Sequence, residues 1–360
     1  MGSRASAIVV VVVAGLVLAA GCSLVTSYDG FTPDGPPCGK RIPSRPPAEA
    51  MQKSGPELVG FTTALQFLED ADAGTTLLGY DLDNLCTCPD HAARSCKNPN
   101  ATADQECDVA NTGIDNAAGT VLGALFPATA NARLQESLLH ATNGLLIRVK
   151  DWDGTADDPS VSVSIWNVAS LKGDTDGGAG AKLDGTDEIL VDYESLLNVM
   201  DLGSKYNATT AFVSGGVLVA PLDLDFRFEI PPPNPLAGTI ASIPLRSASL
   251  VGKIATKGAV GLVLTDAQLV GRLPMADVFK QVANIGICQN TPAFAGLKKP
   301  ACAAFDLPLK QPGGSGRSEL PCDALSFAVG LTVGPAKLAG YAMIRQAMSP
   351  CGAEPAVTCP

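Results

Sequence analysis

The sequence predicts a mainly β fold, an antiparallel β-sandwich of the jelly-roll or concanavalin-like kind, with a few helical insertions and disulfide-stapled loops. Three observations predict it. Short apolar stretches recur at regular spacing with turn residues between them, as in sandwiches. Several of these stretches alternate apolar and polar residues, as half-buried antiparallel strands do. The 360 residues include 37 glycines and 27 prolines, which imply many turns, and 46% are apolar, which is enough for a large core.

The first 21 residues have the three parts of an export signal. Arg4 is the positive charge, Ala7–Ala20 is apolar, and small residues precede Cys22. This apolar stretch is shorter than the roughly 20 residues of a membrane-spanning helix. Cys22 follows Ala19-Ala20-Gly21, as in the lipobox of bacterial lipoproteins, where the thiol is acylated. We expect a lipoprotein signal peptide over residues 1–21 and lipidation of Cys22; secretion with an unmodified Cys22 is the alternative.

Residues 22–53 are predicted to form a flexible tether. Thr32–Pro37 and Pro43–Pro47 are rich in proline and lack apolar periodicity. Such a spacer would hold a folded domain away from a membrane. The rest, residues 54–360, is predicted to form one β-rich domain, with a division into two lobes near residues 231–235 as the alternative.

The first elements of that domain are predicted to be a strand over Leu58–Leu68 and an extended segment over Thr75–Leu85. Leucines at helical spacing then predict helices over Asp115–Leu125 and Arg133–His140. A further short helix is predicted over Met275–Val282.

Strands dominate the remainder. The clearest alternation is Val161–Trp166, and Gly215-Gly216 marks a turn within a longer β segment. Residues Cys288–Cys322 are predicted to be a stapled loop. The strand segments are Gly144–Val149, Val161–Trp166, Ala211–Phe228, Leu236–Ile243, Ala248–Ile254, Ala259–Val270 and Ser326–Ile344.

Cysteine usage indicates an oxidising compartment. Besides Cys22 the chain has an even number of cysteines, which in an exported protein favours disulfides. A local bridge between Cys288 and Cys302 is plausible, and the other pairings stay open. Zinc binding is the alternative, but Cys86 and Cys88 form a C-x-C pair without the spacing of zinc ribbons. The disulfide candidates are Cys38, Cys86, Cys88, Cys96, Cys107, Cys288, Cys302, Cys322, Cys351 and Cys359.

The net charge of −11 argues against two classes of partner, nucleic acids and anionic lipids. An acidic surface disfavours nucleic acid and anionic lipid headgroups. We therefore expect no nucleic acid partner, and membrane association only through an N-terminal lipid.

Two acidic hairpins are the best candidates for a cofactor, which would be calcium. Calcium takes six to eight oxygen ligands, and D-x-D-G places two carboxylates on one side of a turn. Neither hairpin completes an EF-hand, and ordinary β-turns are the alternative. The first hairpin carries Asp151, Asp153, Asp157 and Asp158, and the second carries Asp174, Asp176, Asp184 and Asp187.

Trp152 is the candidate ligand-binding aromatic residue, since an indole beside an acidic hairpin can stack on a sugar ring; packing over the hairpin is the alternative. No catalytic residues are predicted, because the chain has no G-x-S-x-G motif and no Walker or dinucleotide-binding motif. A glycan hydrolase would need two carboxylates about 5–10 Å apart in one cleft.

Several segments resemble uncharacterised predicted cell-surface lipoproteins of myxobacteria and their relatives. The resemblance implies a location at the outer membrane or cell surface, with a periplasmic-facing position as the alternative, and implies no activity. The segments that carry it are Leu78–Asp83, Asn143–Val149 with Asp151–Gly154, Leu183–Asp187, Val213–Val217 and Pro321–Leu325.

The function expected from these observations is non-enzymatic. We expect a lipid-anchored surface protein with a structural role, or with a role in binding an extracellular or periplasmic ligand. Calcium-dependent carbohydrate binding through the acidic hairpins and Trp152 is the alternative, and a glycan hydrolase is the weaker one.

Overall fold

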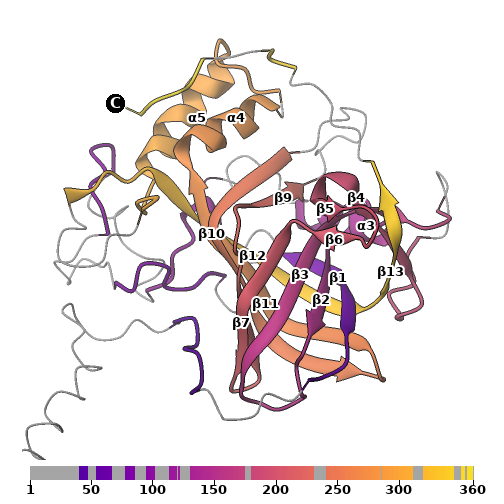
Figure 1. The fold of residues 1–360 in the computed structure, drawn as a ribbon. Coiled ribbons are helices and arrows are strands. Elements are labelled where there is room, and N and C mark those ends of the chain that lie inside the picture. The colour runs from indigo at the N-terminus through magenta and orange to yellow at the C-terminus, as the bar shows by residue number, and fades with distance from the viewer. Residues whose placement is uncertain are drawn as a thin grey trace, which may run out of the picture. The chain divides into compact units, whose positions relative to one another are not determined.

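One large sheet dominates the structure, which is a computed structural model (Figure 1). The described residues belong to one compact unit, Pro37–Pro360. They are 40–47, 54–66, 78–85, 95–101, 113–119, 121, 130–174, 180–230, 241–284, 286–310, 319–343, 350–352 and 355–359.

The large sheet has 11 strands, and a second sheet has two, β5 and β6. Their bounds are β1 (Leu58–Gln66), β2 (Leu145–Lys150), β3 (Asp158–Leu171), β4 (Glu188–Asp192), β5 (Leu196–Asn198), β6 (Gly203–Ser204), β7 (Tyr206–Ser214), β8 (Val217–Pro221), β9 (Phe226–Ile230), β10 (Ala241–Lys257), β11 (Gly261–Pro274), β12 (Ala324–Pro335) and β13 (Lys337–Ala342).

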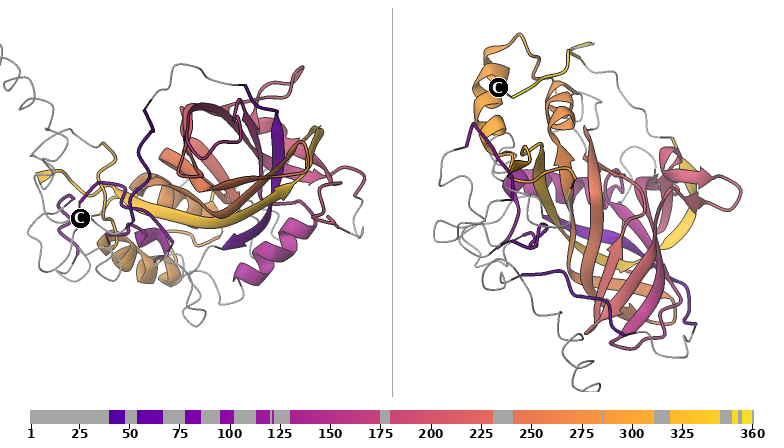
Figure 2. Two further views of the ribbon diagram at one scale, coloured as in Figure 1. Left: turned by 90° about the horizontal axis from the view of Figure 1, so that it is seen from below. Right: turned by 60° about the vertical axis from the view of Figure 1, so that its left-hand side comes forward.

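The large sheet closes on itself. Its strands follow the order β3-β2-β1-β12-β11-β10-β8-β7, and β7 then pairs with β3. The closing pairs include Val161 with Ala211 and Ile165 with Tyr206. Eight strands therefore form a closed ring (Figure 2, left), while β4 and β13 extend from β3, and β9 pairs with the first part of β10.

Side-chain alternation divides the ring into an inner and an outer face. The strand registers place one set of aliphatic residues on a common face, and this set is fully buried. Because successive side chains point to opposite sides, the alternate residues of the same strands lie outside. The inside is thus a packed apolar core. Its members include Ile147, Val163, Leu218, Leu250, Leu269 and Val329.

Helices cover parts of the outside. Helix α3 (Ala130–Leu139) packs against β1, where Leu138 lies close to Phe61 and Gly144. Helix α4 (Met275–Asn284) buries Val278, Phe279 and Val282. Helix α5 (Pro292–Ala303) begins at the N-cap Thr291, whose hydroxyl accepts a hydrogen bond from the Phe294 amide at 3.3 Å.

Two segments without regular structure cover another part of the outer face. Residues 40–47 and 78–85 contribute Ile42, Leu78 and Tyr80 to a small apolar cluster with Val251 and Val270 of β10 and β11. The backbone amide of Asp81 donates to the carbonyl of Lys40 at 2.9 Å, which joins the two segments. We call this part of the surface the outer wall; it consists of the outward faces of β10, β11 and β12.

The mainly β prediction is confirmed, but the two-layer sandwich is not confirmed, because a continuous path of paired strands closes into a ring. The predicted strands Leu236–Ile243 and Ala248–Ile254 overlap a single strand, β10. The prediction that residues 288–322 form only a loop is wrong, since α5 lies within this range. The expected lobe boundary near residues 231–235 lies outside the described residues.

Three disulfides join distant parts of the described chain: Cys96–Cys322, Cys288–Cys351 and Cys302–Cys359. The use of cysteines as staples is therefore confirmed, and the local bridge Cys288–Cys302 is wrong. Local spacing suggested that bridge, but both cysteines pair with the C-terminal segment instead. Four further candidates, Cys38, Cys86, Cys88 and Cys107, lie outside the described residues, as does Cys22.

Candidate functional site

Buried polar groups gather on the outer wall, where residues 78–85 cross β11. Alternation along β11 points Gln268 and Arg272 outward. The Gly79 amide donates to Oε1 of Gln268 at 2.7 Å, and Nη2 of Arg272 donates to the Leu82 carbonyl at 2.8 Å. These two side chains thereby fix the segment that carries Asp81 and Asp83.

Residues 113–119 lie beside this segment. Tyr80 and Asp115 form an antiparallel bridge, with the Asp115 amide donating to the Tyr80 carbonyl at 3.1 Å. The Ala117 amide donates to the Ser326 hydroxyl of β12 at 2.7 Å. The outer wall therefore holds both segments in register.

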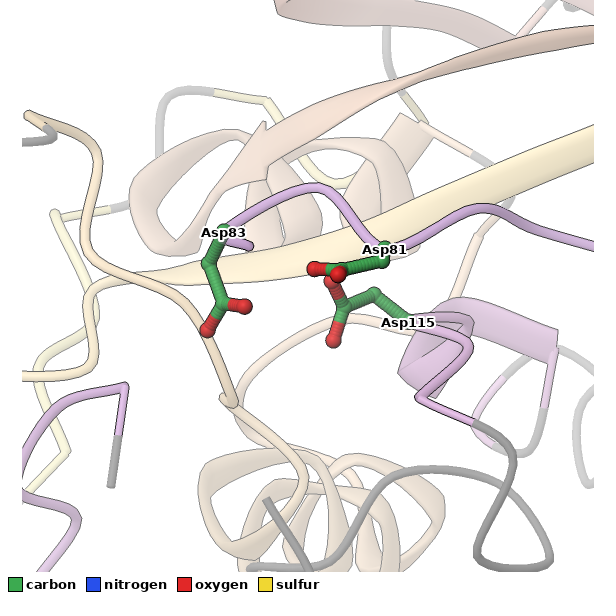
Figure 3. Close-up of side chains that lie close together, drawn as sticks. All are labelled: Asp81, Asp83 and Asp115. Carbon is green, nitrogen blue, oxygen red and sulfur yellow. The ribbon is translucent and has the colours of Figure 1, made fainter. Parts of the chain in front are cut away.

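This register brings three carboxylates together. One oxygen from each of Asp81, Asp83 and Asp115 lies within 4.8 Å of the others, and all three residues are buried (Figure 3). Figure 3 shows Asp81 and Asp83 on one segment and Asp115 on the other. In the part of the chain that the structure describes, no other group of three His, Cys, Asp or Glu residues meets this distance. We call these three residues the acidic cluster.

Some oxygens of the acidic cluster have local donors. The Leu82 amide donates to Oδ2 of Asp115 at 2.6 Å, and the Leu85 amide donates to Oδ1 of Asp83 at 2.7 Å. The Ser95 hydroxyl donates to Oδ2 of Asp83. These bonds set the rotation of two of the three carboxylates.

Asp81 is placed differently. Its Oδ2 lies 3.3 Å from Nε of Arg41, a side chain that is 35% exposed. The Asp81 side chain itself is 0% exposed, and its Oδ1 has no hydrogen-bond partner among the described residues. A buried carboxylate oxygen without a partner is energetically costly.

Burial also changes the protonation of this region. It raises the pKa of Asp81 to about 6, and the neighbouring Asp83 adds to the rise, while the Asn84 amide and Arg41 oppose it. Burial raises the pKa of Asp306 to about 7, although hydrogen bonds from Ser326 oppose the shift. Asp83 contributes to the Asp306 shift as well. The acidic cluster is thus part of a larger group of buried carboxyl groups.

A pocket of about 230 Å³ adjoins the acidic cluster. It lies between residues 78–85 and the outward faces of β10 and β11. Among the described residues, Asp81 is the one acidic residue of its lining, which includes no histidine or cysteine. We call it the wall pocket; its lining includes Ile42, Asp81, Asn84, Ser247, Ser249 and Arg272.

The carboxylates of the first acidic hairpin cap backbone amides. Oδ1 of Asp153 accepts from the Thr155 amide at 2.9 Å, and Oδ1 of Asp157 accepts from the Gly215 amide at 2.8 Å. Asp158 accepts from the amides of Asp153 and Ser160. The bonds from the Thr155 amide to Asp153 and from the Ser160 amide to Asp158 form Asx turns. Asp151 is exposed at φ 67°.

The second acidic hairpin follows the same pattern. Asp187 accepts from the Lys182 and Leu183 amides at 2.9 and 2.7 Å, and Asp184 accepts from the Thr186 amide at 2.9 Å. Oδ2 of Asp174 lies 3.6 Å from Nδ1 of His140. Asp176 falls outside the described residues. Neither hairpin belongs to the acidic cluster, and calcium binding there stays a prediction.

Trp152 does not offer an exposed ring. It is 6% exposed and belongs to the large core cluster, and its Nε1 donates to the Thr155 carbonyl at 2.9 Å. The ring of Trp152 therefore packs over the hairpin, which was the alternative to stacking on a sugar.

Sequence reasoning missed the acidic cluster as a site. Asp81-Leu82-Asp83 has the same D-x-D spacing as Asp151 and Asp153 in the first acidic hairpin. Asp115 joins them only through the pairing of two segments on the outer wall. The acidic hairpins were the stronger prediction because each carries four aspartates that are close in sequence.

Among the described residues, no helix has the length and apolar character needed to cross a membrane. No protein-family model, curated protein or solved structure matches the chain.

Proposed function

We propose that this chain is a non-enzymatic, lipid-anchored surface protein that binds a small polar ligand in the wall pocket. The observation that carries the binding role is the wall pocket itself. Charged and hydroxyl side chains from β10 and β11 line it beside buried carboxylates, while the inner face of the ring is packed with aliphatic residues. Five of the eight described residues that line the wall pocket are polar or charged, which favours a small polar ligand over an apolar one.

The composition of the wall pocket supports a binding role over catalysis. Hydrolysis of a glycan needs an acid and a base or nucleophile facing the same bond, at about 5–10 Å from each other. Asp81 is the one acidic residue in the described lining of the wall pocket, and its side chain is 0% exposed, while Asp83 and Asp115 do not line the pocket. Arg272 is buried and donates to the Leu82 carbonyl, so it offers a positioned hydrogen-bond donor, which suits recognition.

The anchoring part of the proposal rests on the sequence around Cys22. An apolar stretch ends in small residues before this cysteine, and a proline-rich spacer follows it. A net charge of −11 gives the protein no electrostatic attraction to anionic lipid, so acylation would supply the membrane affinity.

Anchoring is tested by expressing the full chain and Cys22→Ala in a bacterial host and separating membranes from soluble protein. We expect the wild-type protein in the membrane fraction, with the mass of an acylated Cys22, and the variant in the soluble or uncleaved form. Cys38→Ala is the matched control and should remain in the membrane fraction. Equal membrane association of wild type and Cys22→Ala would overturn the anchor.

Calcium-dependent carbohydrate binding is the second candidate, and the contact between the wall pocket and the acidic cluster favours it. Asp81 belongs to both, so an ion held by the cluster would lie next to a bound sugar. Calorimetry with a panel of neutral mono- and disaccharides, in calcium and in chelator, tests this candidate. We expect binding only in calcium and its loss in Arg272→Met, with exposed Arg246→Met as the control; heat that is independent of calcium would contradict it.

A further inference from the structure

We propose that Asp81, Asp83 and Asp115 bind one calcium ion, which fastens residues 78–85 to residues 113–119 on the outer wall. The inference goes beyond the proposed function, because the ion would be bound whether or not the chain is anchored and whether or not the wall pocket holds a ligand.

The spacing of the oxygens fits the ion. Calcium binds oxygen at about 2.3–2.6 Å, so ligands on opposite sides of the ion lie up to about 5 Å apart. One oxygen from each member of the acidic cluster lies within 4.8 Å of the others. A single ion can therefore lie between all three oxygens.

The unpartnered oxygen of Asp81 is a second and independent observation. Its Oδ1 has no hydrogen-bond partner among the described residues. Because the Asp81 side chain is 0% exposed, bulk water cannot serve as the missing donor. Figure 3 shows the Asp81 carboxylate extending towards the other two members of the acidic cluster. A cation between them would satisfy this oxygen.

The surrounding charges leave room for a cation. Arg41 contacts Oδ2 of Asp81 and is partly exposed, and Lys40 lies over the Tyr80 ring at 4.8 Å. Arg272 donates to the Leu82 carbonyl. The three carboxylates of the acidic cluster oppose these cations. Three carboxylates whose oxygens lie within 4.8 Å of one another repel each other, and a divalent ion between them would offset that repulsion.

The chemistry of the donors selects calcium among common metals. All three side chains offer carboxylate oxygen, which suits hard cations, and the cluster contains no thiolate or imidazole for zinc. Magnesium retains several waters and prefers open sites, whereas calcium accepts irregular sets of protein oxygens. The buried position of the acidic cluster therefore favours calcium.

The test uses the full-length protein, stripped with chelator and titrated with calcium chloride in a calorimeter. We expect one calcium ion per chain and a higher melting temperature in calcium than in chelator. Asp81→Asn and Asp115→Asn should weaken calcium binding at least tenfold. Asp153→Asn is the matched control from the first acidic hairpin and should bind calcium as the wild type does.

A second measurement separates a metal site from a merely structural role. In chelator, Asp81→Asn removes one charge from a repulsive cluster, so we expect it to melt at a higher temperature than the wild type. In calcium the order should reverse. No heat at millimolar calcium, stronger binding of magnesium than of calcium, or loss of binding in Asp153→Asn with normal binding in Asp115→Asn would each overturn the proposal.

Discussion

Cys96 and Cys322 form a disulfide that spans 226 residues, with their Cα atoms 5.1 Å apart. The bridge lies next to a backbone hydrogen bond from the Lys97 amide to the Leu320 carbonyl. It thereby ties residues 95–101, which lie between Asp83 and Asp115 in sequence, to the start of β12. Because Ser95 donates to Asp83, this disulfide also helps to position one member of the cluster.

The first prediction concerns this disulfide. Replacing both cysteines by alanine should lower the free energy of unfolding by about 2–5 kcal/mol, because the unfolded chain gains the entropy of a long loop. The matched control is the double alanine variant of Cys288 and Cys351. The disulfide between these two cysteines closes a loop of 63 residues. The loss should be about 1 kcal/mol larger for Cys96–Cys322. Urea denaturation measures both, and a larger loss in the control would contradict the prediction.

The sequence predicts the individual strands well where alternation is local. The segment Gly144–Val149 corresponds to β2, and Val161–Trp166 lies within β3. Closure of the ring was not predictable in this way. It depends on pairs such as Leu65 with Leu331, and an alternating pattern defines a face without defining a partner.

The same limit explains the disulfides and the acidic cluster. The partner of Cys288 is Cys351, and the spacing of cysteines does not reveal this. Asp81 and Asp115 meet because two segments bind to the same wall. Helix α5 was missed because Pro300 lies inside it, although Thr291 followed by Pro292 is a helix-start signal.

The second prediction concerns Gly79, which lies in residues 78–85 at their close approach to residues 113–119. Its φ is +121°, and a Cβ there would lie 2.7 Å from the Asp115 carbonyl oxygen. Gly79→Ala therefore combines backbone strain with a contact that must push residues 113–119 away, and should cost about 3 kcal/mol or more. If the calcium proposal holds, calcium affinity should fall as well.

Gly258 provides the control for this substitution. It also has a positive φ, +71°, but a Cβ there meets nothing within 4 Å. Gly258→Ala should cost only about 1 kcal/mol and leave calcium binding unchanged. Urea denaturation measures the free energy of unfolding of both variants. Equal losses would show that the close approach of Gly79 to residues 113–119 adds nothing to the cost of the substitution.

The third prediction concerns the inside of the ring. Leu250 of β10 is 0% exposed and faces other aliphatic side chains, so Leu250→Ala should leave a cavity and cost about 2–5 kcal/mol. Leu197 is 74% exposed, and Leu197→Ala should change stability by less than about 0.5 kcal/mol. Thermal and urea denaturation measure the difference, and a small loss in Leu250→Ala would be inconsistent with a packed interior.

The fourth prediction is a pH dependence carried by Glu229 on β9. Burial raises the pKa of Glu229 from 4.5 to about 7, with Asp192 adding to the rise and Arg227 opposing it. Below pH 4.5 the carboxyl group is protonated in both the folded and the unfolded chain. Between pH 4.5 and about 7 the unfolded chain releases this proton while the folded chain retains it. The folded chain then binds more protons, so stability falls as the pH rises through this range.

Glu229→Gln removes this dependence. Relative to its value at pH 4.5, the stability of the variant should exceed that of the wild type by about 1–3 kcal/mol at pH 8. Comparing the two pH values cancels any constant cost of burying the amide. Glu188→Gln is the control, because Lys172 lies 2.7 Å away and lowers the pKa of this exposed carboxyl group below 4.5. The contribution of Glu188 is lost only as the pH falls below about 4.5, so the difference between this variant and the wild type should stay nearly constant from pH 4.5 to 8. A difference between wild type and Glu229→Gln that stays constant from pH 4.5 to 8 would show that Glu229 does not cause the dependence.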